Sequence, residues 1–285
     1  MRINTNISAM NTYSRLTSAN ASKSGSLAKL SSGLRINKAG DDAAGLAISE
    51  KMKNQVSGMA QATRNAQDGI SLIQTAEGAL KETHTILNRM RDLVVQSNND
   101  TNTAEDRSAI QKELDSLTSE VDRISKDTQF NTKTLLTGTY SGTAKELKFQ
   151  IGANKSQTIG LSIRNMTASG LKVSGLTIAN SGIGSGTPEG TKANHDTVLE
   201  KVDAAIKSVS EERANLGAVQ NRLDHTISNL ATTKENLSEA NSRIVDVDMA
   251  EEMMSFTKSN ILSQAATAML AQANQMPQGV LQLLQ

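Results

Sequence analysis

The residue types that most often perform chemistry are few in this chain, and their spacing fits helix surfaces better than a catalytic centre. The three histidines, His84, His195 and His225, are far apart and lack the i, i+4 pairing or the neighbouring carboxylate motif of a metal site. Asp41 and Asp42 are adjacent carboxylates that could suggest acid–base work or Mg²⁺ binding. They follow a glycine and precede a helical pattern, so we interpret them as helix-capping residues.

Other candidate sites also have simpler explanations. An acidic cluster, Asp246, Asp248, Glu251 and Glu252, fits the solvated first turn of a terminal helix. The run Gly182–Gly186 has loop composition and is not a dinucleotide fingerprint. Cysteine is absent, which excludes disulfides, a thiolate nucleophile and Cys-based zinc sites. We therefore expect that this protein is not an enzyme and that it has no catalytic residue, metal or cofactor.

Composition limits the partners of the chain. The net charge of the 285 residues is +1, so there is no electrostatic argument for nucleic acid. Aromatic residues make up only 2%, less than the core of a compact enzyme of this size normally contains. No apolar run approaches the roughly 18 residues of a membrane span, so we expect no membrane insertion. The N-terminus lacks the layout of a secretory signal peptide, and an extracellular destination would require another export route.

The sequence predicts that most residues lie on long helices. At each end of the chain, a set of mostly small or apolar residues recurs at alternating gaps of four and three, and we call each set a stripe. The N-terminal stripe is Ile3, Ile7, Met10, Ser14, Thr17, Ala21, Ser24 and Ala28, and the C-terminal stripe is Val247, Ala250, Met254, Thr257, Ile261, Gln264 and Ala268. Such spacing places each set on one helix face. Because most of these side chains are small, one pair of helices buries little apolar area, and we expect other copies of the chain to complete the burial.

Between the ends, the pattern predicts helix, long helix, helix, a small β region, long helix and terminal helix. The first helix is expected to end near Gly33, the second near residues 97–100, and Thr103 is expected to cap the third. Residues 147–151 and 159–163 alternate as short strands, and 181–191 reads as an exposed Gly/Ser-rich loop. The last helix is expected to run towards Pro277. The fold class is mainly α: an elongated antiparallel helical bundle or coiled coil with paired terminal helices and a small β-hairpin region at the tip.

Several long motifs resemble bacterial flagellin over nearly the whole chain. They are INTNISAMNT at 3–12, LSSGLRINKAGDDAAGLAIS at 30–49, NAQDGISLIQTAEGAL at 65–80, MRDLVVQ at 90–96, LGAVQNRLDHTISNL at 216–230, SRIVDVDMAEEM at 242–253 and MLAQANQ at 269–275. A flagellar hook–filament junction protein would share the terminal-helix plan, and a cytoplasmic coiled-coil adaptor or chaperone would share the stripes. The long match through RINKAGDDAAGLAIS favours the filament subunit. One departure is Phe130-Asn131-Thr132, where many flagellins have Gly after Asn.

The resemblance implies a self-polymerising, extracellular filament subunit that is exported unfolded. It implies a terminal domain, 1–42 with 243–285, lining the inner tube of the filament, and a rod, 43–180 with 192–242, forming the outer tube, with no added outer domain. The expected polymerisation seam is Ile3, Ile7, Met10, Ala21, Ala28, Val247, Met254, Ile261 and Ala268.

The resemblance also implies other partners: an export chaperone, the filament cap, hook–filament junction proteins and the innate immune flagellin receptor. The candidate receptor epitope is Arg89, Leu93 and Glu113. The candidate chaperone contacts are Met253, Phe256, Ile261, Leu262, Met269 and Leu270.

Overall fold

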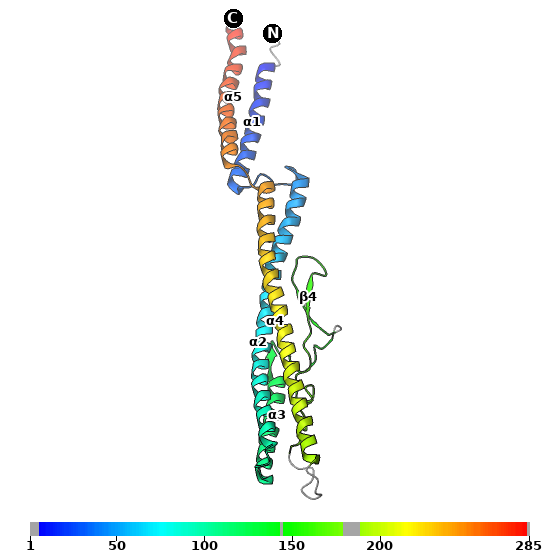
Figure 1. Cartoon of the computed structure of the whole chain (residues 1–285). Coiled ribbons are helices and arrows are strands. Elements are labelled where there is room, and N and C mark those ends of the chain that lie inside the picture. The colour runs from blue at the N-terminus through cyan, green and yellow to red at the C-terminus, as the bar shows by residue number, and fades with distance from the viewer. Residues whose placement is uncertain (1–5, 143–144, 179–188, 284–285) are drawn as a thin grey trace. The chain divides into compact units, whose positions relative to one another are not determined.

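The structure is a computed structural model that describes residues 6–142, 145–178 and 189–283, with side chains described outside 189–194 and 276–283. Within these residues the chain forms five helices: α1 Ile7–Ser32, α2 Ala43–Ser97, α3 Ala104–Asp127, α4 Glu189–Val245 and α5 Met249–Leu283 (Figure 1). Four short strands are described: β1 Gln129–Phe130, β2 Lys133–Thr134, β3 Leu147–Gln150 and β4 Thr158–Leu161. The chain divides into two compact units, a terminal unit of 1–56 with 235–285 and a central unit of 57–234.

Short capping motifs set the helix boundaries close to the predicted positions. Gly33 ends α1 in the left-handed region at φ 72°, and its N–H donates to the Lys29 carbonyl at 2.8 Å. At the start of α3, the Thr103 hydroxyl accepts from the Asp106 N–H, and the Asp106 carboxylate accepts from the Thr103 N–H, which forms a capping box. The helix ends predicted near Gly33 and Ser97 and the cap predicted at Thr103 are therefore confirmed.

Within the terminal unit, the connection from α1 to α2 is fixed by the two aspartates. Asp41 Oδ2 accepts hydrogen bonds from the backbone N–H groups of Asn37 and Lys38, at 3.0 and 2.9 Å. Asp42 Oδ1 accepts from the Gly45 N–H at 2.8 Å and satisfies a free donor in the first turn of α2. Their carboxylates thus have the capping and turn-forming role expected from the sequence.

In the central unit, α2 packs antiparallel to both α3 and α4. Arg89 of α2 pairs with Glu113 of α3, and Arg91 of α2 pairs with Asp203 of α4. The core between them is built from leucine, valine, isoleucine, alanine and methionine side chains, with leucine the most frequent. Its largest fully buried members include Ile73, Leu80, Leu87, Met90, Leu93, Leu114 and Leu216. A thin layer of aliphatic side chains is sufficient because each long helix directs only one stripe of side chains towards the others.

The predicted strands form an antiparallel hairpin in which Leu147 pairs with Leu161 and Gln150 with Thr158. The prediction that this region lies at the tip of the bundle is wrong: the hairpin lies alongside α2. Asn65 Nδ2 donates to the Gln150 carbonyl at 3.1 Å, and a Cβ added at Gly69 would come within 3.2 Å of the Phe149 ring. A glycine on the helix surface leaves room for the aromatic ring, and the sequence pattern alone does not indicate that pairing.

A second hairpin, β1 with β2, was not predicted. Gln129 pairs with Thr134 and Phe130 with Lys133, and the two turn residues between the strands have positive φ. Asn131 has φ 48° and Thr132 has φ 64°. Two consecutive positive φ values are typical of the type I′ turn that joins two-residue hairpins. The departure from Asn-Gly at this point therefore places a threonine where glycine is favoured.

Two helix boundaries differ from the sequence expectation. The expected loop 181–191 falls largely outside the described residues, but α4 already begins at Glu189. The last helix does not end near Pro277, because α5 continues to Leu283. Residues 162–178 have almost no regular secondary structure, yet Ile163, Val173 and Leu176 are buried in the core of the central unit.

Candidate assembly interface

The terminal helices α1 and α5 pack against each other in antiparallel orientation. Lys29 Nζ lies 3.7 Å from a carboxylate oxygen of Glu252, near the end of α1 and the start of α5. Further along, the Ser263 hydroxyl donates to Asn20 Oδ1 at 2.8 Å. The residue numbers of the contacting pairs thus decrease along α1 while they increase along α5, as expected for antiparallel helices. The expected side-by-side arrangement of the two chain ends is confirmed.

The residues that face the partner helix also repeat at gaps of three and four. On α1 the buried and half-buried positions at this spacing are Ala9, Thr12, Leu16, Ala19, Lys23, Ser26 and Leu30. On α5 they are Glu252, Phe256, Ser259, Ser263, Ala266, Leu270 and Ala273. We call these two sets the paired faces. Because most of their side chains are small or polar, this contact alone provides little apolar burial.

The stripes identified in the sequence are not the paired faces. On each helix the predicted stripe runs two positions before the paired face, and two residues correspond to a rotation of about 200° around the helix. Ile7, Met10, Met254 and Ile261 are each at least 60% exposed. Ala21, Ala28 and Ala268 are also exposed, Val247 is half-buried, and Ile3 lies outside the described residues. The spacing was right, but these stripes do not pack within the chain.

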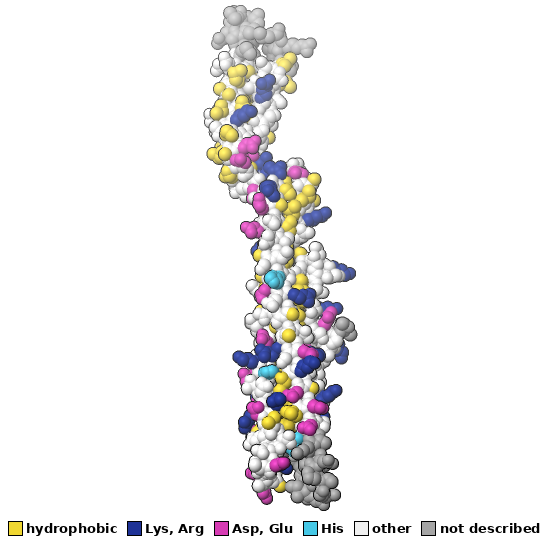
Figure 2. All heavy atoms as spheres, viewed as in Figure 1, with side chains coloured by type: hydrophobic (Ala, Val, Ile, Leu, Met, Phe, Trp, Pro, Cys, Tyr) yellow, Lys and Arg dark blue, Asp and Glu magenta, His cyan; other side chains and the backbone are white. Residues whose placement is uncertain are grey.

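Large apolar side chains are therefore exposed along both terminal helices, and Figure 2 shows hydrophobic side chains over this part of the molecule. Besides the stripe residues they are Tyr13, Leu27, Met249, Met253, Leu262 and Met269. We call the predicted stripes together with these residues the outer face. Many large apolar side chains exposed along the same two helices indicate a candidate interaction surface.

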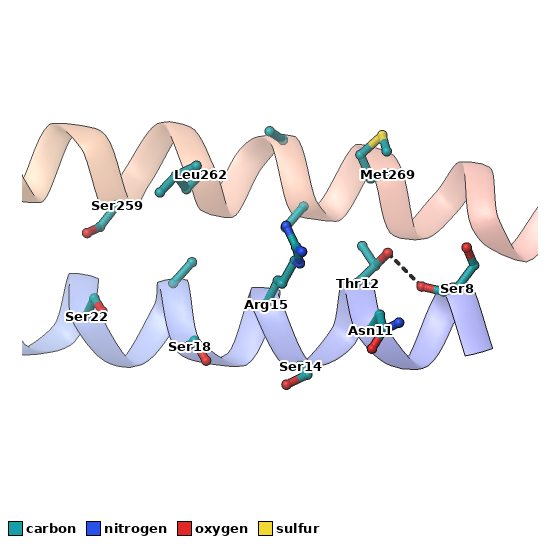
Figure 3. Close-up of a pocket in the computed structure, with 13 residues that line it drawn as sticks. Ser8, Asn11, Thr12, Ser14, Arg15, Ser18, Ser22, Ser259, Leu262 and Met269 are labelled. Carbon is teal, nitrogen blue, oxygen red and sulfur yellow. Dashed lines mark hydrogen bonds between the residues drawn. The ribbon is translucent and has the colours of Figure 1, made fainter. Parts of the chain in front are cut away.

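A groove of about 660 Å³ runs between α1 and α5 (Figure 3). Its α1 wall is mostly polar, with Ser8, Asn11, Thr12, Ser14, Arg15, Ser18 and Ser22, and its α5 wall includes Leu262 and Met269. Arg15 extends from α1 towards α5 in this view. The groove is lined by residues of the paired faces, such as Thr12 and Ala266, and by Leu262 and Met269 of the outer face.

Asn6 joins the free ends of the two terminal helices. Its Oδ1 accepts from the Ala9 N–H at 3.0 Å and caps α1, while its Nδ2 donates to the Ala273 carbonyl at 2.8 Å. In a continuous α-helix that carbonyl would accept from the N–H of residue 277, but residue 277 is proline and has none. Asn6 therefore supplies the donor that Pro277 lacks, which is one reason α5 can continue past the proline.

The three candidate receptor residues are brought together, but not on one surface. Arg89 Nε and Nη2 both donate to Glu113 Oε1, at 2.9 and 2.7 Å, and both side chains are partly exposed. Leu93 is only 1% exposed and belongs to the core between the helices. In this structure only the charged pair is accessible to a partner.

The six candidate chaperone contacts do not share one helix face. Met253, Ile261, Leu262 and Met269 are exposed, whereas Phe256 and Leu270 belong to the paired face and are half-buried against α1. A partner that contacts all six must bind α5 when it is separated from α1.

Among the residues whose side chains are described, the most strongly buried carboxylate is one that the sequence pattern does not reveal. Glu212 of α4 is 1% exposed, and its Oε2 lies 2.9 Å from Arg164 Nε. The hydrogen bond to Glu212, together with Glu211 at 3.2 Å, raises the pKa of the Arg164 guanidinium. Nothing in the sequence marks Glu212 among the many charged helix residues, because its partner lies 48 positions away on an irregular segment.

The residues considered first for chemistry do not form a site. In the described part of the chain, no group of three or more His, Cys, Asp or Glu residues could hold a metal ion. Backbone hydrogen bonds from Lys38 and Asn37 lower the pKa of Asp41, as expected for a turn-forming carboxylate. Among the described residues, none of the helices has the length and apolar character needed to cross a membrane.

Comparison with known proteins defines the class to which this architecture belongs. Residues 3–141 match the bacterial flagellin N-terminal helical region, and residues 199–284 match the bacterial flagellin C-terminal helical region. The chain belongs to the bacterial flagellin family, whose members are structural subunits of the extracellular flagellar filament and not enzymes.

Individual relatives agree with this assignment. The chain is 54% identical to flagellin of Bacillus subtilis (strain 168) and 48% identical to the flagellar filament 33 kDa core protein of Treponema phagedenis, with full coverage of both chains in each case. Among solved structures, a hook-associated protein of Vibrio parahaemolyticus has a TM-score of 0.58, covering 72% of this chain and 100% of that one. At 19% identity, that similarity concerns the fold alone. The match to flagellin models and relatives favours the filament subunit over the junction protein and the cytoplasmic adaptor.

Proposed function

We propose that the outer face of α1 and α5 is the surface through which copies of this chain polymerise. The observation that carries the proposal is the separation of two faces on the same helices. One face of each helix packs within the chain, and the stripe with Ile7, Met10, Met254 and Ile261 lies opposite and exposed.

The physical argument concerns apolar area. Burial stabilises by roughly 25 cal/mol for each Å² of apolar surface, and the small side chains of the paired faces provide little of it. Two different helices with unlike outer faces favour a contact between unlike surfaces. Such a contact produces a helical filament when its rotation does not close into a ring. The predicted terminal domain, 1–42 with 243–285, would then line the inner tube of the filament. The predicted rod, 43–180 with 192–242, would form the outer tube.

Export through the flagellar secretion apparatus would require the chain to travel unfolded, and an export chaperone would then cover α5. Four of its candidate contacts are exposed and two are reached only when α1 is displaced, which supports binding to an unpaired α5. Chaperone binding and polymerisation should exclude each other. Titrating a cognate chaperone into monomer, while measuring affinity and polymer yield, tests this, and tight binding with undiminished polymer yield contradicts it.

The remaining partners follow from the position of the chain in a filament. At the filament ends the same outer face would meet the cap and the hook–filament junction proteins. Recognition by the innate immune flagellin receptor would use Arg89 and Glu113 directly, with Leu93 supporting the helix pair from the core.

Truncation of either terminal helix tests the central proposal. Removing residues 1–33 or 242–285 should leave a soluble chain that does not sediment under polymerising conditions and forms no filaments in electron microscopy. The central unit keeps its own core in both variants, so near-complete retention of its cooperative unfolding is the control. Normal filaments from either truncation would contradict the proposal.

A further inference from the structure

The methionines of this chain are distributed unevenly between the two units. Of its 11 methionines, five have side chains between 49% and 68% exposed: Met10, Met249, Met253, Met254 and Met269. All five belong to the terminal unit. Met59, Met90 and Met166, in contrast, are at most 5% exposed and belong to the central unit. Met52 is half-buried, and the side chains of Met1 and Met276 lie outside the described part.

Exposure decides which thioethers an oxidant can reach. Hydrogen peroxide transfers one oxygen atom to the sulfur: the peroxide O–O bond breaks, an S–O bond forms, the sulfur loses two electrons, and the peroxide is reduced to water. The product, methionine sulfoxide, is polar and disrupts interfaces rich in methionine. The five exposed side chains are open to this reaction before assembly.

We propose that these five methionines form an oxidation site that controls assembly, and we call them the methionine set. The inference rests on the proposed function, because it requires other copies to cover the outer face. A sulfoxide is well hydrated on the free chain, so oxidation leaves the fold of the monomer unchanged. Polymerisation would bury sulfoxide oxygens among the apolar side chains of the outer face, and that cost opposes assembly.

The location of the set supports this effect. Met254 belongs to the predicted C-terminal stripe and Met10 to the N-terminal one, so both terminal helices are affected. Each subunit would bring several sulfoxides into the contact, and the effect accumulates along the polymer.

Peptide mapping by mass spectrometry tests the first step. Monomer treated with hydrogen peroxide should form sulfoxide in the methionine set roughly tenfold faster than at Met59, Met90 and Met166, as exposure predicts. In preformed filaments the set should be protected. Equal rates at exposed and buried positions, or equal rates in monomer and filament, would overturn the inference.

Polymerisation after oxidation tests the second step. Oxidised monomer should unfold at the untreated temperature but need a concentration roughly tenfold higher to polymerise, and methionine sulfoxide reductases A and B should restore the original value. A variant with all five residues changed to Leu, a volume-conserving substitution, should polymerise after the same treatment. The reductase experiment uses the natural chain and therefore decides the question even where the fivefold variant folds poorly.

Two results have different meanings. Oxidised chain that polymerises as well as untreated chain overturns the oxidation site and leaves the proposed function intact. Failure of the untreated chain to polymerise contradicts the proposed function itself.

Discussion

At the residue scale, Thr132 stands in a backbone conformation that a β-branched residue rarely adopts. Its φ of 64° and the φ of 48° at Asn131 define a turn in which glycine is favoured at the second position. The Thr132 hydroxyl donates to the Asn131 carbonyl at 2.6 Å, which offsets part of the strain. The turn joins β1 to β2 directly after α3, so its stability contributes to the central unit.

Replacing Thr132 with Gly should stabilise the chain by about 1 kcal/mol, because left-handed backbone costs a residue with a Cβ about that much. Urea unfolding of the monomer measures the effect. Thr132→Ala is the matched control, since it removes the hydroxyl but keeps the Cβ. Ala should give no gain, and a gain from Ala equal to that from Gly would show that φ is not the cause.

Arg164 and Glu212 show how one buried charge depends on its partner. Glu212 is buried and Arg164 is partly exposed, so the two substitutions should have unequal effects. Arg164→Met leaves an unpaired buried carboxylate and should cost about 3 kcal/mol of unfolding free energy. Glu212→Gln leaves a guanidinium that water can reach and should cost less. Equal losses in denaturant unfolding would mean that desolvation of Glu212 is not the main cause of the lost stability.

At the element scale, the helix pair α1–α5 depends on its ends as well as on its faces. Asn6 caps α1 and also donates to the Ala273 carbonyl, which Pro277 leaves without an N–H donor. The sequence does not show this link, because the two residues are separated by almost the whole chain. It becomes visible only when the antiparallel register is known.

Asn6→Asp should weaken the end of the helix pair by about 1 kcal/mol, since a carboxylate can cap α1 but cannot donate to a carbonyl. In a Pro277→Ala background, the backbone N–H of residue 277 satisfies Ala273, and the same substitution should cost much less. Thermal unfolding of the four chains, followed by circular dichroism, gives the coupling. A coupling of zero would contradict the assigned role.

The capping box at the start of α3 predicts a dependence on pH. Hydrogen bonds from the Thr103 backbone and hydroxyl lower the pKa of Asp106 below its ordinary value of 3.8. A carboxyl with a lower pKa in the folded state contributes stability above its unfolded pKa and loses it as the pH falls through the folded pKa. The stability difference between the natural chain and Asp106→Asn should therefore be constant above pH 3.8 and shrink below it. A difference that grows on acidification would reverse the assigned sign.

The elements also show what periodicity can and cannot predict. The alternation at 147–151 and 159–163 predicts the β3–β4 hairpin correctly, because one side of it faces the core. The hairpin β1–β2 has only two residues per strand, too few for any period. On α1 and α5 the spacing is correct, but the stripe is not the face that packs within the chain, because Ala, Ser and Thr occur on every side. The larger residues Ile7, Met10, Met254 and Ile261 make the stripe they belong to look like a core face, although each is at least 60% exposed in the single chain.

At the scale of the whole molecule, the sequence motifs identify the family more firmly than they identify its contacts. Long motifs such as RINKAGDDAAGLAIS span capping residues and turns whose side-chain types are specific, so the family assignment follows from them. Pairing between distant residues, such as Arg164 with Glu212 or Asn6 with Ala273, leaves no local pattern. An apolar surface that other copies cover has the same spacing in the sequence as a core face. In the structure of the single chain, however, it is exposed.

The central claim is that the outer face of the terminal helices serves assembly and not the fold of the single chain. The measurement that tests it most directly is sedimentation and electron microscopy of the double variant Ile7→Glu with Ile261→Glu, beside Ile7→Val with Ile261→Val. Both positions are exposed in the single chain, so the acidic variant should keep the helix content and unfolding temperature of the natural monomer. Burying unpaired carboxylates between copies is costly, so that variant should form no filaments while the valine variant assembles normally. Normal filaments from the acidic variant, or a monomer that unfolds because of it, would contradict the account.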